Sequence, residues 1–248
     1  MTFEQLFEHF RDVYGVNNSV YTTSLADRVG LLSIATRRLQ DGFRKKRSRD
    51  ILTRLVAGVV ARAFAVADHF RNIPLNRVMC EKYPPGRCGY CESSPCECRA
   101  SDRSIHSAEK GCGVTHENCD QLGWTLGQHA HSLHELYLER NRLSGIDNCL
   151  SRLFAEIAEI TEFEQGVAAA GMDAHQIQLE YAKEIADVFA WTIAVAGILD
   201  VDIEDAVMNM YGQGCPVCSK KPCMCKKSIV VGGVIRHTMD AYPQSQPA

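Results

Sequence analysis

The sequence contains no run of about 18 uncharged apolar residues, so we expect no membrane-spanning helix. Its first residues, MTFEQLFEHFRDVYG, mix acidic with apolar side chains and lack the basic start and plain apolar run of a secretory signal. We therefore expect a cytoplasmic protein with no membrane partner. The net charge of −3 predicts no general attraction to nucleic acid or to anionic membranes.

Segments that alternate polar and apolar residues with the period of a β-strand are also scarce. Helical periodicity prevails, which predicts an all-α fold. A chain of 248 residues with 46% hydrophobic residues can bury a real core, and its length suits either one large domain or two smaller ones. The exception is residues 228–237 (SIVVGGVIRH), where two glycines between apolar pairs predict a small hairpin.

Cysteine, by contrast, is abundant and follows a repeated pattern. Cys-x-x-Cys-x4-Cys-x-Cys occurs in residues 88–98 (CGYCESSPCEC) and again in residues 215–225 (CPVCSKKPCMC). Thiols stay reduced in the cytosol, so closely spaced cysteines bind metal more often than they form disulfides there. Four thiols suit a closed, structural zinc site. An iron–sulfur cluster and shared or intermolecular ligation are the alternatives. The predicted zinc ligands are Cys88, Cys91, Cys96, Cys98, Cys215, Cys218, Cys223 and Cys225.

The segments before the two Cys boxes are alike, which predicts an internal duplication. AVADHFRNIPLNRVM (65–79) matches AVAGILDVDIEDAVM (194–208) in its opening and its ending. A period near 127 to 129 residues is too long for a solenoid repeat and suits tandem domains.

The duplication divides the chain into three parts. We predict a first repeat, a polar linker and a second repeat, over residues 1–98, 99–122 and 123–248. Three linker residues are either an incomplete metal site or incidental, and they are Cys112, His116 and Cys119.

Each repeat is expected to form a four-helix unit followed by a zinc knuckle. The first repeat has predicted helices near residues 2–14, 20–41, 48–71 and 74–82. The second has predicted helices near residues 125–143, 147–166, 173–199 and 202–211. Asp173 and Asp202 are the candidate N-caps within the second repeat.

Two pairs of acids lie at helical spacing in the second repeat. Glu156-x-x-Glu159 and Glu184-x-x-Asp187 each place two carboxylates on one face of a helix. Glu184 and Asp187 share their arc with apolar residues such as Trp191, so these acids point toward the expected core. Buried carboxylates without partners are costly, and the neighbouring sequence has too few Lys or Arg at helical spacing. The pattern favours a site for Mg²⁺ or Mn²⁺, with a solvated acidic groove as the alternative.

The order of these acids, followed by LDVDIEDAV, resembles the MazG-like, all-α nucleoside triphosphate pyrophosphohydrolases, a superfamily that also contains dimeric dUTPases and phosphoribosyl-ATP pyrophosphohydrolases. The match covers residues 125–211. The resemblance implies that Glu156, Glu159, Glu184 and Asp187 hold Mg²⁺. It also implies cleavage of a nucleoside triphosphate between the α and β phosphates, which releases a monophosphate and pyrophosphate. A glutamate would accept the proton of the attacking water, with Glu159 or Glu156 as the candidates and Glu162 as a more remote one.

The first repeat lacks these acids, because Leu55 and Gly58 stand where the second repeat has Glu184 and Asp187. Members of the family commonly build their sites at dimer interfaces. The resemblance therefore implies an intrachain pseudo-dimer with one working half, which is either complete alone or pairs again as a homodimer.

A basic segment, RRLQDGFRKKRSR, occupies residues 37–49 of the first repeat. It is either a solvated loop or a phosphate-binding loop that leans over the acids, with Arg44, Lys45, Lys46 and Arg47 as the binding residues. Nucleic-acid binding is the weakest interpretation, because Phe43 is the one aromatic residue among these charges.

Two functions follow from the sequence. The first is a Mg²⁺-dependent nucleotide pyrophosphohydrolase whose partner is a nucleoside triphosphate. The alternative is a zinc-stabilised, non-catalytic protein that senses nucleotides or acts as an adaptor. The pattern does not identify the base or the sugar of the nucleotide.

Overall fold

The computed structural model describes residues 1–70, 73–88, 91–98, 120–225, 228–230 and 234–236. Helices dominate these residues, as predicted, and the all-α class is confirmed. The first half of the chain contains α1 (Phe3–Tyr21), α2 (Leu25–Arg44), α3 (Arg49–Ala67) and α4 (Leu75–Lys82). A short 3-10 helix, η3 (Asp120–Gly123), precedes α5 (Leu126–Ser144), α6 (Ile146–Ala170), α7 (Ala174–Ile198) and α8 (Ile203–Tyr211).

A small antiparallel pair of strands follows the helices, as residues 228–237 predicted. It consists of β1 (Ser228–Val230) and β2 (Val234–Arg236), with Ile229 opposite Ile235. None of the helices in the described part of the chain is long and apolar enough to cross a membrane.

The helix ends follow the capping residues of the sequence. The side chains of Asp173 and Asp202 accept hydrogen bonds from the first turns of α7 and α8, which confirms both predicted N-caps. Thr2 and Thr125 begin α1 and α5 with the same capping box, each with a glutamine three residues later. The prediction for α1 ended too early, because its apolar pattern continues through Gly15 and a single glycine is tolerated within a helix.

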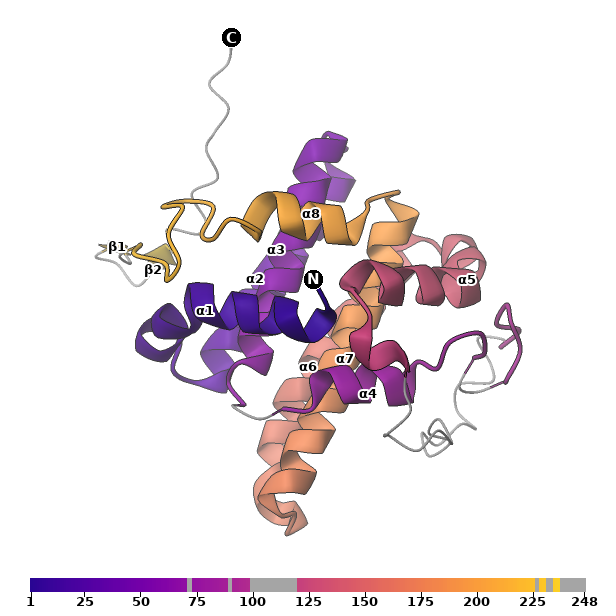
Figure 1. Ribbon diagram of the computed structural model, residues 1–248, viewed down its shortest axis with the longest axis horizontal. Coiled ribbons are helices and arrows are strands. Elements are labelled where there is room, and N and C mark those ends of the chain that lie inside the picture. The colour runs from indigo at the N-terminus through magenta and orange to yellow at the C-terminus, as the bar shows by residue number, and fades with distance from the viewer. Residues whose placement is uncertain (71–72, 89–90, 99–119, 226–227, 231–233, 237–248) are drawn as a thin grey trace.

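Four long helices form the centre of the molecule (Figure 1). α2 packs on α3 and α6 packs on α7, and these two pairs meet through α2 on α6 and α3 on α7. α1 and α5 pack on α3 and α7, respectively. The rings of Phe3, Phe64 and Phe189 from α1, α3 and α7 lie with centroids 4.8–5.3 Å apart. The two halves of the chain therefore share one hydrophobic core.

The halves also exchange their last helices. α4 packs against α7 of the second half, and α8 packs against α3 of the first half. The Cys boxes that follow these helices also contact the opposite half of the chain. The Cys96 backbone N–H donates to the Leu136 carbonyl at 2.9 Å, and the Cys223 N–H donates to the Val13 carbonyl at 2.8 Å. Two separate four-helix units are therefore not confirmed, because each half completes the packing of the other.

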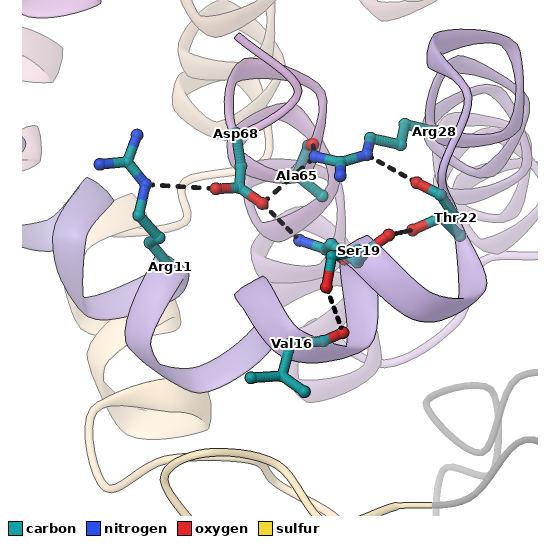
Figure 2. Close-up of polar contacts among 8 residues, drawn as sticks. Arg11, Val16, Ser19, Thr22, Arg28, Ala65 and Asp68 are labelled. Carbon is teal, nitrogen blue, oxygen red and sulfur yellow. Dashed lines mark hydrogen bonds and ion pairs between the residues drawn. The ribbon is translucent and has the colours of Figure 1, made fainter. Parts of the chain in front are cut away.

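A buried ion pair joins the ends of the first three helices (Figure 2). Asp68, which follows α3, accepts from Arg28 of α2 at 3.2 Å, from Asn18 of α1 at 3.1 Å and from Arg11 of α1 at 3.2 Å. Arg28 also donates to the Thr22 and Ala65 carbonyls, each at 2.8 Å. The side chains of Arg28 and Asp68 are 6% and 12% exposed, so the Arg28 charge depends on Asp68 for compensation.

We expect Asp68→Ala to lower the free energy of unfolding by about 3–5 kcal/mol, because it leaves the buried Arg28 without its counter-charge. Asp12→Ala is the matched control. It removes an exposed ion pair with Lys221, and such pairs contribute about 0–1 kcal/mol. Denaturant unfolding measures both values. Equal losses in the two variants would contradict the role of this network.

Candidate functional site

Three of the four predicted carboxylates meet between α6 and α7. Glu156 lies on α6, and Glu184 and Asp187 lie one turn apart on α7. One ligand oxygen from each of them lies within 4.8 Å of the other two, and all three residues are partly buried. We refer to Glu156, Glu184 and Asp187 as the acid cluster. Helical spacing places Glu184 and Asp187 on one face of α7, and the packing of α6 on α7 brings Glu156 to them.

Glu159 lies at the edge of the acid cluster, one turn beyond Glu156 on α6. Its side chain is exposed, and it is not part of the compact group of three. Its charge nevertheless acts on Glu156 and Glu184. Glu162, the more remote candidate, is exposed further along α6.

Burial and the neighbouring acids raise the pKa values of both glutamates of the acid cluster. Burial, with Asp187 and Glu159 nearby, raises the pKa of Glu156 to about 7, while a hydrogen bond from Trp191 opposes this shift. Burial also raises the pKa of Glu184 to about 7; Lys82 lowers it, and Asp187 and Glu159 raise it further. Both glutamates are therefore only partly ionised near neutral pH when no cation is bound.

One oxygen of the acid cluster has no partner within the described part of the protein. Glu184 Oε2 is buried and makes no hydrogen bond, whereas Glu156 Oε1 accepts from Trp191 Nε1 at 3.0 Å. An orphaned carboxylate oxygen among further acids is costly unless a cation or a proton compensates it. Together the three residues offer only oxygen ligands, the type that hard divalent cations prefer.

Two residues of the first half reach the acid cluster, and sequence reasoning missed both. Lys82, at the end of α4, forms an ion pair with Asp187 Oδ2, and the Tyr83 hydroxyl donates to Asp187 Oδ1. Lys82 also donates to the Lys183 carbonyl at 3.3 Å. Burial and the Asp187 carboxylate raise the pKa of Tyr83, so its hydroxyl stays protonated and donates. No local pattern predicts this contact, since Lys82 and Asp187 are more than a hundred residues apart.

The cysteines of each box come together as the sequence predicted. Within each group, the four sulfurs lie within 4.8 Å of one another, and none of the described cysteines forms a disulfide. The sulfur separations are 3.8 Å for Cys88 and Cys98, and 3.7 Å for Cys215 and Cys225. A tetrahedral zinc ion with bonds of about 2.3 Å separates its sulfurs by about 3.8 Å, so both groups could hold zinc. We call the group in residues 88–98 the first cysteine cluster and the group in residues 215–225 the second cysteine cluster.

The first cysteine cluster lies on α5 of the second half. In addition to the Cys96 hydrogen bond to Leu136, Arg140 donates to the Cys96 sulfur at 3.2 Å. In the second cysteine cluster, burial raises the pKa of Cys218, but backbone N–H groups of Met224 and Lys220 lower it to about 6. A sulfur that accepts such hydrogen bonds is stabilised as the thiolate that a metal requires.

The basic segment does not lie over the acid cluster. Arg44 pairs with Asp147 at 3.4 Å in the first turn of α6, and Arg49 pairs with Asp200 at 3.1 Å beyond the end of α7. Asp147 precedes Glu156 by nine residues, or about 13 Å along the helix. Arg44 and the residues that follow it, Lys45, Lys46 and Arg47, therefore lie near the start of α6, whereas the acid cluster lies near the middle of α6 and α7, and we do not assign them to the acid cluster.

Two further predictions concern parts of the chain away from these clusters. Leu55 and Gly58 lie on α3, and within the described residues the metal-capable groups are the acid cluster and the two cysteine clusters. The linker residues Cys112, His116 and Cys119 lie outside the described residues.

Searches of protein-family models, of curated proteins and of solved structures find no match to this chain.

Proposed function

We propose that the protein is a divalent-cation-dependent nucleotide pyrophosphohydrolase that cleaves a nucleoside triphosphate to the monophosphate and pyrophosphate. The observation that carries the proposal is the acid cluster, in which Glu156, Glu184 and Asp187 bring their oxygens within 4.8 Å of one another. The unpaired Glu184 Oε2 supports it, because a buried carboxylate oxygen without a hydrogen bond is costly unless a cation or a proton compensates it. The order of the acids along the chain supplies the reaction class by resemblance.

The acid cluster would hold Mg²⁺ or Mn²⁺, since its ligands are all oxygens. A bound Mg²⁺ neutralises phosphate charge and lowers the pKa of a water molecule. The surrounding residues orient the ligands. Trp191 fixes the Glu156 carboxylate by its hydrogen bond, and Tyr83 fixes Asp187.

Two other residues would act on the substrate. Glu159 is exposed beside the cluster, where it is placed to accept the proton of the attacking water. Lys82 is a cation in contact with the cluster, which makes it a better phosphate-binding candidate than the distant basic segment.

The tandem repeat is part of the proposal. The matching capping boxes at Thr2 and Thr125 support it, and so do the reciprocal hydrogen bonds of the two Cys boxes. The first repeat has no acid cluster among its described residues but contributes Lys82 and Tyr83 to that of the second, as expected for a pseudo-dimer within one chain.

The test is product analysis with a panel of nucleoside triphosphates in Mg²⁺. We expect equal amounts of monophosphate and pyrophosphate from at least one of them, with no release of single phosphate. The reaction should stop in excess EDTA and return when Mg²⁺ is added. Orthophosphate as the product, or no product from any triphosphate, would refute the proposal.

One observation favours the alternative of a non-catalytic nucleotide sensor or adaptor. Both oxygens of Asp187 already accept from Lys82 and Tyr83, which partly compensates the acids without a metal. Under this alternative, triphosphates bind to the protein and are recovered intact.

A further inference from the structure

The acid cluster and the first cysteine cluster are connected through the end of α4. Lys82 is the last residue of α4, Tyr83 follows it, and both contact Asp187. The chain enters the first cysteine cluster at Cys88, five residues after Tyr83. That cluster is fixed to α5 by the hydrogen bond from Cys96 to Leu136 and by the contact of Arg140 with the Cys96 sulfur.

We propose that the first cysteine cluster, when it holds zinc, regulates cation binding at the acid cluster by keeping Lys82 on Asp187. This inference rests on the cation site of the proposed function. The Lys82 ammonium and a divalent cation both require the Asp187 carboxylate. They therefore compete, and each must weaken the binding of the other.

The first cysteine cluster is one of the anchors that follow α4 closely along the chain. α4 has only eight residues, too few for a stable isolated helix. Buried Leu75, Val78 and Met79 anchor its body in the core. Beyond them, Tyr83 packs partly buried against the core, its carbonyl accepts from Gln121 at 3.2 Å, and Pro84 is buried before the chain enters the first cysteine cluster at Cys88. Loss of zinc should loosen the end of α4 and weaken the contact of Lys82 with Asp187, whereas the body of α4 stays packed.

The second cysteine cluster provides an internal control. It is attached to α1 through Cys223 and Val13, and the helix before it, α8, packs on α3. The positions on α3 that correspond to Glu184 and Asp187 are Leu55 and Gly58, so α8 covers no carboxylates there. Zinc loss from the second cysteine cluster should leave the acid cluster unchanged.

The experiment measures Mn²⁺ binding by the electron paramagnetic resonance signal of free Mn²⁺, with no nucleotide present. We expect Lys82→Met to tighten Mn²⁺ binding by about tenfold, a typical size for coupling between two sites. Lys183→Met is the matched control, since Lys183 pairs with Glu180 instead, and it should change binding less than about twofold. Cys98→Ser should also tighten Mn²⁺ binding, as Lys82→Met does, whereas Cys225→Ser should not.

The combined variant separates coupling from general loosening. If the first cysteine cluster acts through Lys82, the double variant binds Mn²⁺ as tightly as Lys82→Met alone, because Cys98→Ser has no further effect on the affinity. In the wild type, Mn²⁺ should also speed the transfer of one zinc ion per chain to a colorimetric chelator, and Lys82→Met should remove this acceleration. The chelator measurement needs no Cys variant, so it decides the matter even if Cys98→Ser does not fold.

The outcomes distinguish this inference from the function on which it rests. Absence of Mn²⁺ binding to the wild type would refute both. Mn²⁺ binding that is unchanged by Lys82→Met would refute the competition and leave the proposed function intact. Equal effects of Cys98→Ser and Cys225→Ser, or additive effects of Cys98→Ser and Lys82→Met, would refute the specific role of the first cysteine cluster.

Discussion

Glu184→Gln is expected to abolish pyrophosphate release, with a loss of at least about 100-fold, and to stabilise the metal-free protein. The loss of activity follows from the removal of one negative oxygen from the proposed cation site. The gain in stability follows from the cost of holding the partly buried Glu184 as an anion beside Asp187 and Glu159. A glutamine of the same shape avoids that cost. Opposite changes in activity and stability are typical of residues kept for function.

The stability change has a defined pH dependence. The folded state raises the pKa of Glu184 from 4.5 to about 7, so it binds this proton more tightly than the unfolded chain does. The contribution of Glu184 to stability is therefore lost as pH rises from about 4.5 to 7, and it stays lost above pH 7. Because the side chain is partly solvated, we expect Glu184→Gln to gain about 1–2 kcal/mol at pH 8, which corresponds to about 2–6 °C in the melting temperature.

Thermal unfolding without divalent cations at pH 5 and pH 8 measures this dependence. The variant and the wild type should melt together at the lower pH and separate at the higher one. Saturating Mg²⁺ at pH 8 should reverse the order, because only the wild type gains from binding. Glu180→Gln is the control, since Glu180 pairs with Lys183 one turn earlier on α7. A variant that is less stable than the wild type at pH 8 without metal would contradict the inference that the Glu184 anion destabilises the fold.

The sequence reveals residues of the site that lie close together along one helix. Glu184 and Asp187 were predictable because three-residue spacing fixes two side chains on one helical face. Glu156 was predictable for a related reason, since it forms a second pair of acids at the same spacing with Glu159. Lys82 and Tyr83 were not predictable, because they reach Asp187 through the packing of α4 on α7. The periodicity of one helix carries no information about which distant helix packs against that helix.

The position of the basic segment was not predictable for the same reason. Its charges, residues 37–49, suggested a phosphate site, but composition alone does not say where the end of α2 lies. That end contacts Asp147 at the start of α6, remote from Glu156. The duplication suggested two separate units for a similar reason. Whether α4 packs on its own half or on the other half depends on core packing across the whole chain, which a comparison of the repeats does not address.

Removal of zinc is expected to have the second large effect, because both cysteine clusters join one half of the molecule to the other. The first cluster contains the buried Cys88 and the second the buried Cys215 and Cys223, and each cluster hydrogen bonds to a helix of the opposite half. Without metal, the sulfurs of each cluster cannot all be thiolates at this spacing, and the turns that carry them lose the ion that holds them together. We expect two zinc ions per purified chain and a loss of several kcal/mol in unfolding free energy when both are removed.

The measurement compares the zinc content with the denaturation midpoint, before and after treatment with a zinc-selective chelator that leaves Mg²⁺ in place. Cys215→Ser should retain one zinc ion and lose part of the stability. Asn17→Ser, at a partly exposed position of α1 away from the metal ligands, should retain both ions and the full midpoint. Iron and a visible absorption band in the purified protein would indicate an iron–sulfur cluster instead. A midpoint that does not change on zinc removal would show that core packing alone holds the exchanged ends together.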